Sequence, residues 1–412
     1  MTIRLIGSGP TTLRDLGMRH GAFSKFTQET GIQVEYVPGP ESTTDRLALY
    51  LQTLERKSST PDVYLIDVVW PGVLANDLVD LRPYLAEEIK QRLGAEVQNY
   101  TVDGRLSAMP ASIERGVLYY RTDLLKKYKY SHPPETWDEL EKMAARIQAG
   151  ERAAGNPDFW GFVWQGAAYE GLTCNALEWQ VSQGGGQIIE PDRTISVNNP
   201  NAILAMERAR RWVGTISPPS VVEYHEEDTR NAFRSGNAAF RRDWLWTANP
   251  SGATEDSPVS GQVAVAHLPA GVGGHASTLG GWSLGVSKYS KHPREAAELV
   301  RYMTSREGST QIWQDNALLQ AFPLDPAFVE LHPDLEQVAD IFTRGAIARP
   351  STITGKQYAR VSRAYFSAIH SILTGQQSAG KALEAAQSEL VTITGFEVKK
   401  LNLKSESVAA PE

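Results

Sequence analysis

Two acidic residues are placed where a polar solute could meet them. Asp67 follows the apolar run Val-Tyr-Leu-Ile of residues 63–66, so it stands at the carboxyl end of a predicted buried strand. Glu114 stands between two further apolar runs and therefore also at a predicted strand end. In open α/β sheets, ligands bind outside the carboxyl ends of the strands. We therefore treat Asp67 and Glu114 as candidate site residues.

Such a pair of carboxyl groups is compatible with more than one role. Glycoside hydrolases use two carboxyl groups roughly 5–10 Å apart, one of them held neutral by an apolar pocket. The same groups can instead accept charge-assisted hydrogen bonds from hydroxyl groups and orient a bound sugar. A structural role is the third interpretation for Asp67, because an aspartate after a strand often caps a helix or a turn.

The stretch 278–287 combines glycines with an aromatic ring, in the order Thr-Leu-Gly-Gly-Trp-Ser-Leu-Gly-Val-Ser. Gly280 and Gly281 allow a close approach of backbone or ligand, because no side chain projects from them. Trp282 adds a flat apolar face with one N–H at its rim. Taken alone, the stretch favours a core tryptophan beside a tight turn. Together with the carboxylates it suits a carbohydrate, whose C–H face stacks on indole and whose hydroxyls need partners.

Metal-binding patterns are absent from the sequence. It has no H-x₃-H or H-E-x-x-H motif, and its single cysteine, Cys174, excludes a disulfide framework and a cysteine-cluster metal site. The run His225-Glu-Glu-Asp228 is the nearest approach to a metal-binding cluster, and its position favours capping of a helix start. We expect no metal ion and no cofactor.

Length and charge limit the class of protein. The chain has 412 residues, of which 41% are hydrophobic, enough for two or more domains with their own cores. Its net charge of -7 disfavours nucleic acid as a partner, because nucleic-acid binding needs a concentrated basic surface. No apolar run approaches the roughly 20 residues of a membrane span. The chain begins directly with a predicted strand and without a signal peptide, which suits a cytosolic protein or a trimmed mature form.

Strands and helices alternate along the chain, which predicts an α/β fold. A strand at 3–6, a helix at 12–30 and a strand at 32–37 form a β-α-β unit with parallel strands and a right-handed crossover. Thr136 and Glu139 form a capping box that begins another helix. Further helices are predicted at 43–56, 136–148, 176–182, 198–213, 226–233, 293–304, 309–316, 357–373 and 378–390, and further strands at 62–67, 106–112, 116–121, 160–164 and 263–268.

Six runs of the sequence resemble extracellular solute-binding proteins of ABC sugar importers, in particular the members that bind trehalose and maltose. The resemblance extends from residue 3 to about residue 390, and it is specific because several long runs match together. The runs are 58–70 (SSTPDVYLIDVVW), 118–125 (LYYRTDLL), 133–140 (PPETWDEL), 159–166 (FWGFVWQG), 235–244 (SGNAAFRRDW) and 278–287 (TLGGWSLGVS).

The resemblance implies a two-lobed, type II periplasmic-binding-protein fold, in which each lobe is a sheet flanked by helices. We expect lobe 1 to contain residues 1–115 and 279–320, lobe 2 to contain 116–278 and 321–395, and residues 396–412 to form a flexible tail. Three hinge crossings are predicted, near Arg115, Ser277 and Gln320. The lobes of such proteins close around the bound solute.

The resemblance also implies which residues contact the solute. Asp67, Arg46, Arg349, Trp244 and the pair Gly281-Trp282 match contact residues of the family. The complete candidate set is Thr12, Ser42, Arg46, Asp67, Ser112, Glu114, Arg115, Trp244, Trp246, Gly281, Trp282 and Arg349.

Some of these positions depart from the family pattern. Ser112-Ile-Glu114-Arg115 stands where the relatives have Tyr-Ile-Asp-Ala, Thr12 replaces a glutamate, and Trp246 replaces a tyrosine. Sugar recognition is sensitive to such changes, because an unmet buried polar group costs about 1–3 kcal/mol. The segment 112–115 is therefore where we expect the choice of solute to be decided.

The sequence thus predicts a periplasmic or extracellular carbohydrate receptor that delivers a disaccharide-sized α-glucoside, trehalose-like or maltose-like, to the permease of an ABC transporter. We expect a monomer without enzymatic activity, peripheral to the membrane and compatible with a lipid anchor. Two alternatives remain open. One is the same fold binding another glycoside, including an anionic one recognised by Arg115, and the other is a glycosidase that uses Asp67 and Glu114.

Overall fold

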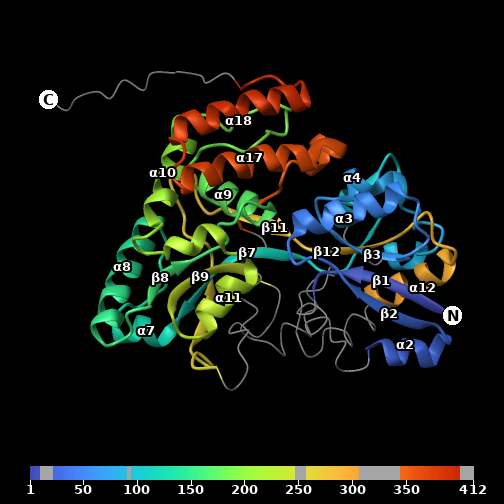
Figure 1. The fold of residues 1–412 in the computed structure, drawn as a ribbon, viewed down its shortest axis with the longest axis horizontal. Coiled ribbons are helices and arrows are strands. Elements are labelled where there is room, and N and C mark those ends of the chain that lie inside the picture. Colours follow the sequence, from blue (N-terminus) through green and yellow to red (C-terminus); the bar gives the residue numbers. More distant parts are fainter. Residues whose placement is uncertain (10–21, 91–93, 246–256, 306–343, 400–412) are drawn as a thin grey trace.

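The two lobes of the protein each contain one β-sheet with helices packed against it (Figure 1). The structure is a computed structural model that describes residues 1–9, 22–90, 94–245, 257–305 and 344–399. Among the described helices, none combines the length and the apolar character that a membrane crossing needs. The predicted α/β, two-lobed architecture is therefore confirmed.

The first sheet has the strand order β2-β1-β3-β12-β6. Its strands β1 and β2 are parallel, as are β1 and β3, whereas β12 runs antiparallel to both β3 and β6. The bounds are β1 Thr2–Gly7, β2 Gln33–Pro38, β3 Val63–Asp67, β6 Met109–Pro110 and β12 Trp282–Val286. The strand β12 is contributed by a distant part of the chain, so the first lobe is built from two segments.

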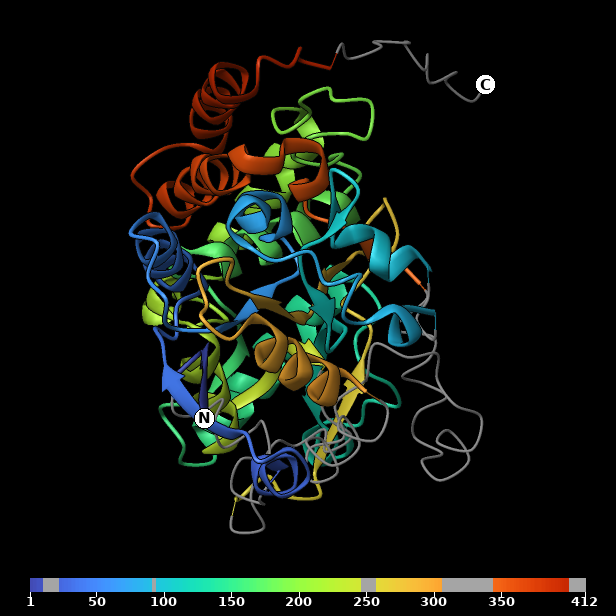
Figure 2. The same cartoon turned by 90° about the vertical axis from the view of Figure 1, so that its right-hand side faces the viewer.

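The helices of the first lobe cover both faces of this sheet, with α12 close to β12 in both views (Figure 1 and Figure 2). They are α2 Ala22–Thr30, α3 Thr43–Glu55, α4 Pro71–Leu74, the 3₁₀ turn Ala75–Asp77, α5 Ala86–Lys90, α6 Gly94–Asn99 and α12 Pro293–Thr304. A small hairpin of β4 Thr101–Val102 and β5 Arg105–Leu106 completes the lobe.

The second sheet has the strand order β13-β11-β7-β9-β8, and β10 pairs with a further part of β7. β7 is antiparallel to β9, β10 and β11, whereas the pairs β8–β9 and β11–β13 are parallel. The bounds are β7 Glu114–Arg121, β8 Trp160–Val163, β9 Ala238–Leu245, β10 Val263–Ala266, β11 Ser277–Gly280 and β13 Ala346–Ile347.

The helices of the second lobe include the C-terminal pair α17 and α18, which lie side by side (Figure 1 and Figure 2). In chain order they are α7 Thr122–Lys127, α8 Trp137–Ala153, α9 Glu170–Ser182, α10 Pro200–Trp212, the 3₁₀ turn Pro219–Glu223, α11 Glu226–Arg234, α16 Ser351–Thr354, the 3₁₀ turn Gly355–Gln357, α17 Tyr358–Leu373 and α18 Ala379–Thr394.

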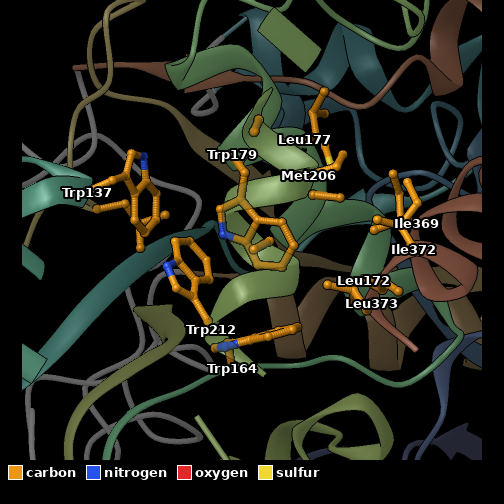
Figure 3. Packing of buried hydrophobic residues seen from close by; sticks show 14 of the residues in the cluster. Trp137, Trp164, Leu172, Leu177, Trp179, Met206, Trp212, Ile369, Ile372 and Leu373 are labelled. Carbon is orange, nitrogen blue, oxygen red and sulfur yellow. The ribbon is translucent and has the colours of Figure 1, made fainter. Parts of the chain in front are cut away.

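A cluster of four tryptophans forms part of the core of the second lobe (Figure 3). The ring centroid of Trp212 lies 5.4 Å from that of Trp137, 6.4 Å from Trp164 and 5.5 Å from Trp179. The indole N–H groups of Trp137, Trp164 and Trp212 all donate hydrogen bonds to side-chain oxygens. These rings are therefore structural, and the aromatic richness of the sequence is largely explained by core packing.

The chain passes between the two sheets in two described places, from β6 to β7 and from β11 to β12. The two passages contact each other, since the backbone N–H groups of Ala111 and Ser112 both donate to the carbonyl oxygen of Trp282, at 2.8 and 3.0 Å. Gly281 has a φ of 141°, and a Cβ there would lie 2.3 Å from the carbonyl oxygen of Ser112. Only glycine fits at this point, because both the backbone conformation and the close approach exclude a side chain.

The predicted crossings near Arg115 and Ser277 lie beside these two passages, whereas the one near Gln320 lies outside the described residues. Arg115 and Leu279 both belong to the second sheet, where they pair with each other. The lobe boundaries after residues 115 and 278 stay predictions. In the predicted tail, residues 397–399 pair with Ile195, so the described chain remains attached up to Lys399.

Most predicted elements are present with small shifts of their ends, and two predictions were wrong. The run 106–112 is not one strand, because Leu106 pairs with Thr101 in a hairpin whereas β6 pairs with β12. The helix expected at 176–182 begins six residues earlier, at Glu170. Almost all residues of α9 are buried, so no amphipathic pattern marks its first turns. The predicted helix at 309–316 lies outside the described residues.

Candidate functional site

The candidate residues meet at the junction of the two sheets because of the strand register. Trp282, the first residue of β12, pairs with Asp67, the last residue of β3. Gly280, the last residue of β11, pairs with Glu114, the first residue of β7. On the next strand Trp244 pairs with Gly116. Two carboxyl groups and two indole rings are thus brought to one junction by four short segments.

An arginine stacks on the half-buried ring of Trp282. The Cζ atom of Arg46, from α3, lies 4.7 Å from the centroid of the Trp282 ring and 5.7 Å from that of Trp70. The backbone N–H of Trp282 donates to Ser112 Oγ at 3.2 Å. The position of the ring is therefore determined from both sides, by a cation over its face and by a hydrogen bond at its backbone.

The guanidinium of Arg46 retains unused hydrogen-bond donors. Arg46 is only 1% exposed, and its Nε and Nη1 atoms have no hydrogen-bond partner within the described part of the chain. Buried donors are almost always paired in folded proteins, since an unpaired one costs about 1–3 kcal/mol. An acceptor atom brought to this place would remove that cost.

The ring of Trp244 lies against a second arginine and against a glycine. The Cζ atom of Arg242 is 4.2 Å from the ring centroid, and a Cβ at Gly280 would lie 2.7 Å from Trp244 Cζ3. The indole Nε1 donates to Glu226 Oε1 at 3.4 Å. The strand β9 ends at Leu245, so the candidate Trp246 lies outside the described residues.

The guanidinium of Arg349 joins carboxylates from both lobes. Its Nη1 donates to Glu170 Oε1 at 2.7 Å, and its Nη2 donates to Asp67 Oδ1 and to the carbonyl oxygen of Leu279, both at 3.3 Å. Asp67 Oδ1 also accepts from the backbone N–H of Val69 at 3.1 Å. The two terminal nitrogens of Arg349 are therefore bonded within the protein, whereas its Nε has no partner among the described residues, and its predicted contact with the solute stays a prediction.

Glu170 is a site residue that sequence reasoning did not find. Its carboxyl also accepts from the hydroxyls of Tyr358 and Ser362, and its backbone N–H donates to Thr44 Oγ1 across the lobes at 3.2 Å. Burial, followed by the charge of Asp67, raises the pKa of Glu170, and the Arg349 guanidinium opposes that rise. Its position in the first turn of α9 was the available signal, but the start of α9 was itself missed.

The carboxyl group of Glu114 is held in a different way. Burial raises its pKa from the ordinary 4.5 to about 8, and the neighbouring charge of Asp67 is the next largest cause. Its hydrogen-bond contact is with Ser112, whose Oγ lies 3.5 Å from Glu114 Oε1. Glu114 is only 8% exposed, and this burial favours the uncharged form of its carboxyl group.

Arg115, Ser42 and Thr12 do not join this group in the described structure. Arg115 lies on the strand face opposite to Glu114, where its Nη1 contacts the carbonyl oxygen of Ser277 at 3.5 Å, and burial lowers its pKa to about 10. Ser42 is the N-cap of α3 and accepts from the backbone N–H of Asp45 at 3.3 Å. Thr12 lies outside the described residues.

The acidic run at the start of α11 contains a helix-capping residue and a second candidate site residue that sequence reasoning did not find. Asp228 accepts from the backbone N–H of His225 at 2.8 Å, so the predicted capping role is confirmed for it. Glu226 instead accepts from the hydroxyl of Tyr169 at 2.6 Å and from Trp244. Because the sequence analysis assigned the whole run to helix capping, it did not predict the contact between Glu226 and the indole ring of Trp244.

Within the described residues there is no group of three or more His, Cys, Asp or Glu side chains that could hold a metal ion. The carboxylates of Asp67 and Glu170 are instead matched by Arg349 and by hydroxyl groups. What the arrangement offers is hydrogen-bond donors and acceptors between two indole rings, which suits the binding of an uncharged hydroxylated molecule.

Residues 15–310 match the family of bacterial extracellular solute-binding proteins. This chain belongs to that family. Over 375 residues it is 48% identical to the probable ABC transporter-binding protein of Deinococcus radiodurans, a match that covers 90% of this chain and 89% of the relative. The similarity between this solute-binding protein and that relative therefore extends over most of both chains.

Solved structures of similar proteins have the same fold. The maltose-bound structure of T. maritima MalE3 is 33% identical to this solute-binding protein, with a TM-score of 0.87 and coverage of 95% of this chain and 99% of that chain. A solute-binding protein from Thermotoga lettingae with bound α-D-tagatose is 21% identical, with a TM-score of 0.83 and coverage of 96% and 100%. The latter likeness concerns the fold alone.

Membership in the family has two direct consequences. The family consists of proteins that bind solutes, and its fold is that of a binding protein, not of an enzyme. Its members act outside the cytoplasm, so the family implies a periplasmic or extracellular location for this solute-binding protein.

Proposed function

We propose that this protein binds a disaccharide-sized α-glucoside, such as maltose or trehalose, between its lobes and delivers it to the permease of an ABC transporter. The observation that carries the proposal is the pairing of Trp282 with Asp67 at the sheet junction, with Glu114 and Trp244 on the adjacent strands. The maltose-bound relative at 33% identity supports the choice of an α-glucoside.

The residues of the junction have complementary roles in this proposal. The ring of Trp282 stacks on the C–H face of one pyranose, and Trp244 does the same for a second. Asp67 accepts hydrogen bonds from sugar hydroxyls, because its Oδ1 already serves Arg349 and Val69 whereas its Oδ2 accepts no hydrogen bond within the described residues. Arg46 supplies its Nε and Nη1 donors, which have no partner among the described residues.

Closure of the lobes completes the proposal. Hinge closure around the ligand is the motion of periplasmic binding proteins, and the hinge residues absorb changes of φ and ψ. Gly281 lies at one passage, and the chain of contacts from Asp67 through Arg349 to Glu170 links the two lobes. A solute that engages Asp67 would thereby act on groups of both lobes.

Isothermal titration calorimetry on protein freed of copurified ligand tests the proposal. The panel contains maltose, trehalose, sucrose, D-tagatose and ribitol, and we expect heat from the α-glucosides with a dissociation constant in the micromolar range or below. Trp282→Ala and Asp67→Asn should abolish the heat. The absence of heat with every sugar of the panel contradicts the proposal.

Trp160 offers a matched control for Trp282. It is also partly buried and also has an arginine over its ring, with Arg152 Cζ at 4.3 Å, but it belongs to β8 at the edge of the second sheet. Trp160→Ala should leave sugar affinity unchanged. If both alanine variants lose affinity equally, the loss reflects general damage to stacked tryptophans and not a sugar platform.

A glycosidase that uses Asp67 and Glu114 is the second candidate, because the raised pKa of Glu114 is the property that a general acid needs. Prolonged incubation with maltose should then release glucose, and Glu114→Gln should abolish the release. Intact maltose after the incubation dismisses this candidate. An anionic glycoside recognised by Arg115 lacks comparable support, since that side chain contacts Ser277 on the other strand face.

A further inference from the structure

The junction contains more buried carboxyl groups than cations bonded to them. Asp67 and Glu170 share the single guanidinium of Arg349, through contacts of 3.3 and 2.7 Å. Glu114 forms no ion pair in the described part of the chain, and its polar contact is the hydroxyl of Ser112 at 3.5 Å. Glu114 is thus an acid of the junction that has no bonded cation among the described residues.

Two further cations near the junction are bound to other acids. Arg230, from α11, donates to Asp243 and Glu227, with 2.9 Å to Asp243 Oδ2. Arg242, from β9, donates to Glu178 Oε2 at 2.9 Å. These pairings leave Glu114 beside the negative Asp67 without a matching bond to a positive group.

We propose that Glu114 meets the bound solute as a neutral carboxylic acid and donates its proton in a hydrogen bond to an acceptor oxygen of the solute, while the carboxylate of Asp67 accepts from a solute hydroxyl. This inference rests on the proposed function and deepens it. It predicts a solute in which an oxygen with a free lone pair, such as a ring or glycosidic oxygen, lies near a hydroxyl group. The two acids of the junction then have opposite hydrogen-bonding roles.

The electrostatic surroundings agree with this assignment. The groups acting on Glu114 are Asp67 from β3, Arg230 from α11, Asp243 from β9 and the adjacent Ser112. Burial and the Asp67 charge outweigh the Arg230 charge, which brings the pKa of Glu114 to about 8. Removing two buried carboxylates from water side by side is more costly than keeping a proton on one of them.

The assignment predicts a dependence of sugar affinity on pH. Below pH 8 Glu114 carries its proton and the affinity is constant on this account. Above about pH 8 the proton must be restored before the solute binds, so the dissociation constant should rise about tenfold per pH unit. A carboxylate that only accepted hydrogen bonds would show no such loss at alkaline pH.

Calorimetric titration of maltose from pH 6 to pH 10 is the first arm of the test. In the wild-type protein we expect the alkaline loss, and in Glu114→Gln we expect it to disappear, because an amide donates at every pH. Glu114→Ala, which removes the donor, should weaken binding about tenfold at pH 7. Glu389→Gln, at an exposed position on α18, serves as control and keeps the wild-type profile.

The second arm observes the proton directly in the ligand-free protein. An infrared difference spectrum between wild type and Glu114→Gln at pH 6 should contain the carbonyl stretch of a protonated carboxyl, and this band should be lost at pH 10. Absence of the band at pH 6 overturns the inference, whatever sugar binds. Sugar affinity that is constant up to pH 10, or an alkaline loss that persists in Glu114→Gln, overturns it as well.

The two arms separate this inference from the proposed function. If no sugar of the panel binds but the band is present, the proposed function fails while the neutral state of Glu114 is upheld. If sugar binds and the band is absent, the proposed function stands and the donor role of Glu114 is wrong.

Discussion

At the junction of the two sheets, each lobe places a tryptophan with an arginine over its ring, and the two stacks differ in how the arginine is satisfied. In the second lobe, Arg242 lies over Trp244 and forms two hydrogen bonds with the buried carboxylate of Glu178. In the first lobe, Arg46 lies over Trp282 at 4.7 Å, yet its Nε and Nη1 have no partner among the described residues. The same pair of residue types therefore serves two different purposes.

The difference indicates which stack is complete within the fold. Glu178 also accepts from the backbone N–H of Thr278 at 3.1 Å, so the Arg242 pair connects α9, β9 and β11 in the core of the second lobe. The Arg46 stack is held by aromatic contact alone and keeps its donors for an added acceptor. We infer that Arg242 serves the fold of the second lobe, whereas Arg46 takes part in binding.

The strongest test breaks the completed stack. Arg242→Met leaves Glu178 buried without its cation, and breaking a buried pair in this way costs about 3–5 kcal/mol of unfolding free energy. Urea denaturation measures the loss. The double variant Arg242→Met with Glu178→Leu should recover most of it, because well-packed apolar residues replace a buried pair at little cost. An Arg242→Met protein within 1 kcal/mol of wild type would contradict the assignment.

The same contrast applies to the acids, since Glu178 has a cation and Glu114 has none. The pKa of Glu114 is raised from 4.5 to about 8 on folding, so the folded state binds the proton more tightly than the unfolded state. The stabilisation is complete below pH 4.5 and is lost as the pH rises through 8, an effect of about 5 kcal/mol.

Glu114→Gln should abolish this part of the pH dependence. Thermal unfolding at pH 5 and pH 8.5 measures it, and the variant should be the more stable protein at pH 8.5. Equal pH dependence in the variant and the wild type would show that another group titrates.

Arg46→Met tests the incomplete stack. The aliphatic side chain still covers the ring of Trp282, so we expect the unfolding free energy to change by less than about 1 kcal/mol. The donors are lost, and maltose affinity should fall by about 1–2 kcal/mol, or roughly fivefold to thirtyfold. Calorimetry and urea denaturation together separate the two effects. If Arg46→Met lost as much unfolding free energy as Arg242→Met, the distinction between the two stacks would be wrong.

The smallest expected effect concerns the glycine beneath Trp244. A Cβ in Gly280→Ala would lie 2.7 Å from Trp244 Cζ3 and would push the ring from its place, at a cost of about 1 kcal/mol in stability. The near-ultraviolet circular dichroism of Trp244 should change with it. Gly380→Ala on α18 is the control, because the nearest atom to its Cβ is 3.9 Å away and the helix should gain stability. An unchanged tryptophan signal in Gly280→Ala would contradict the close packing.

Much of the fold was predictable because local patterns agree with it. Thr136 is the N-cap of α8 as its capping box indicated, and the buried run before Asp67 is the strand β3. Where a pattern was weak, the prediction failed. The helix α9 is buried on nearly all sides, so its first turn and with it Glu170 carried no amphipathic signal.

For the site, the sequence indicated which residue types could bind a solute, but it did not indicate which of these residues bond to one another. Asp67, Glu114 and Trp282 were recognisable as candidates from strand ends and glycines, and the register brings them together. The sequence could not reveal that Arg349 is bonded to two acids from different lobes, because Asp67, Glu170 and Arg349 are separated by more than a hundred residues along the chain.

The sequence by itself determined the α/β class, the family and the residue types available for binding, because these depend on local periodicity and on motifs of neighbouring residues. Tertiary structure decided which arginine is neutralised and which keeps free donors, and which carboxyl group holds a proton. Those properties depend on burial and on charges within a few ångströms, and such distances arise only when segments far apart in the chain are packed together.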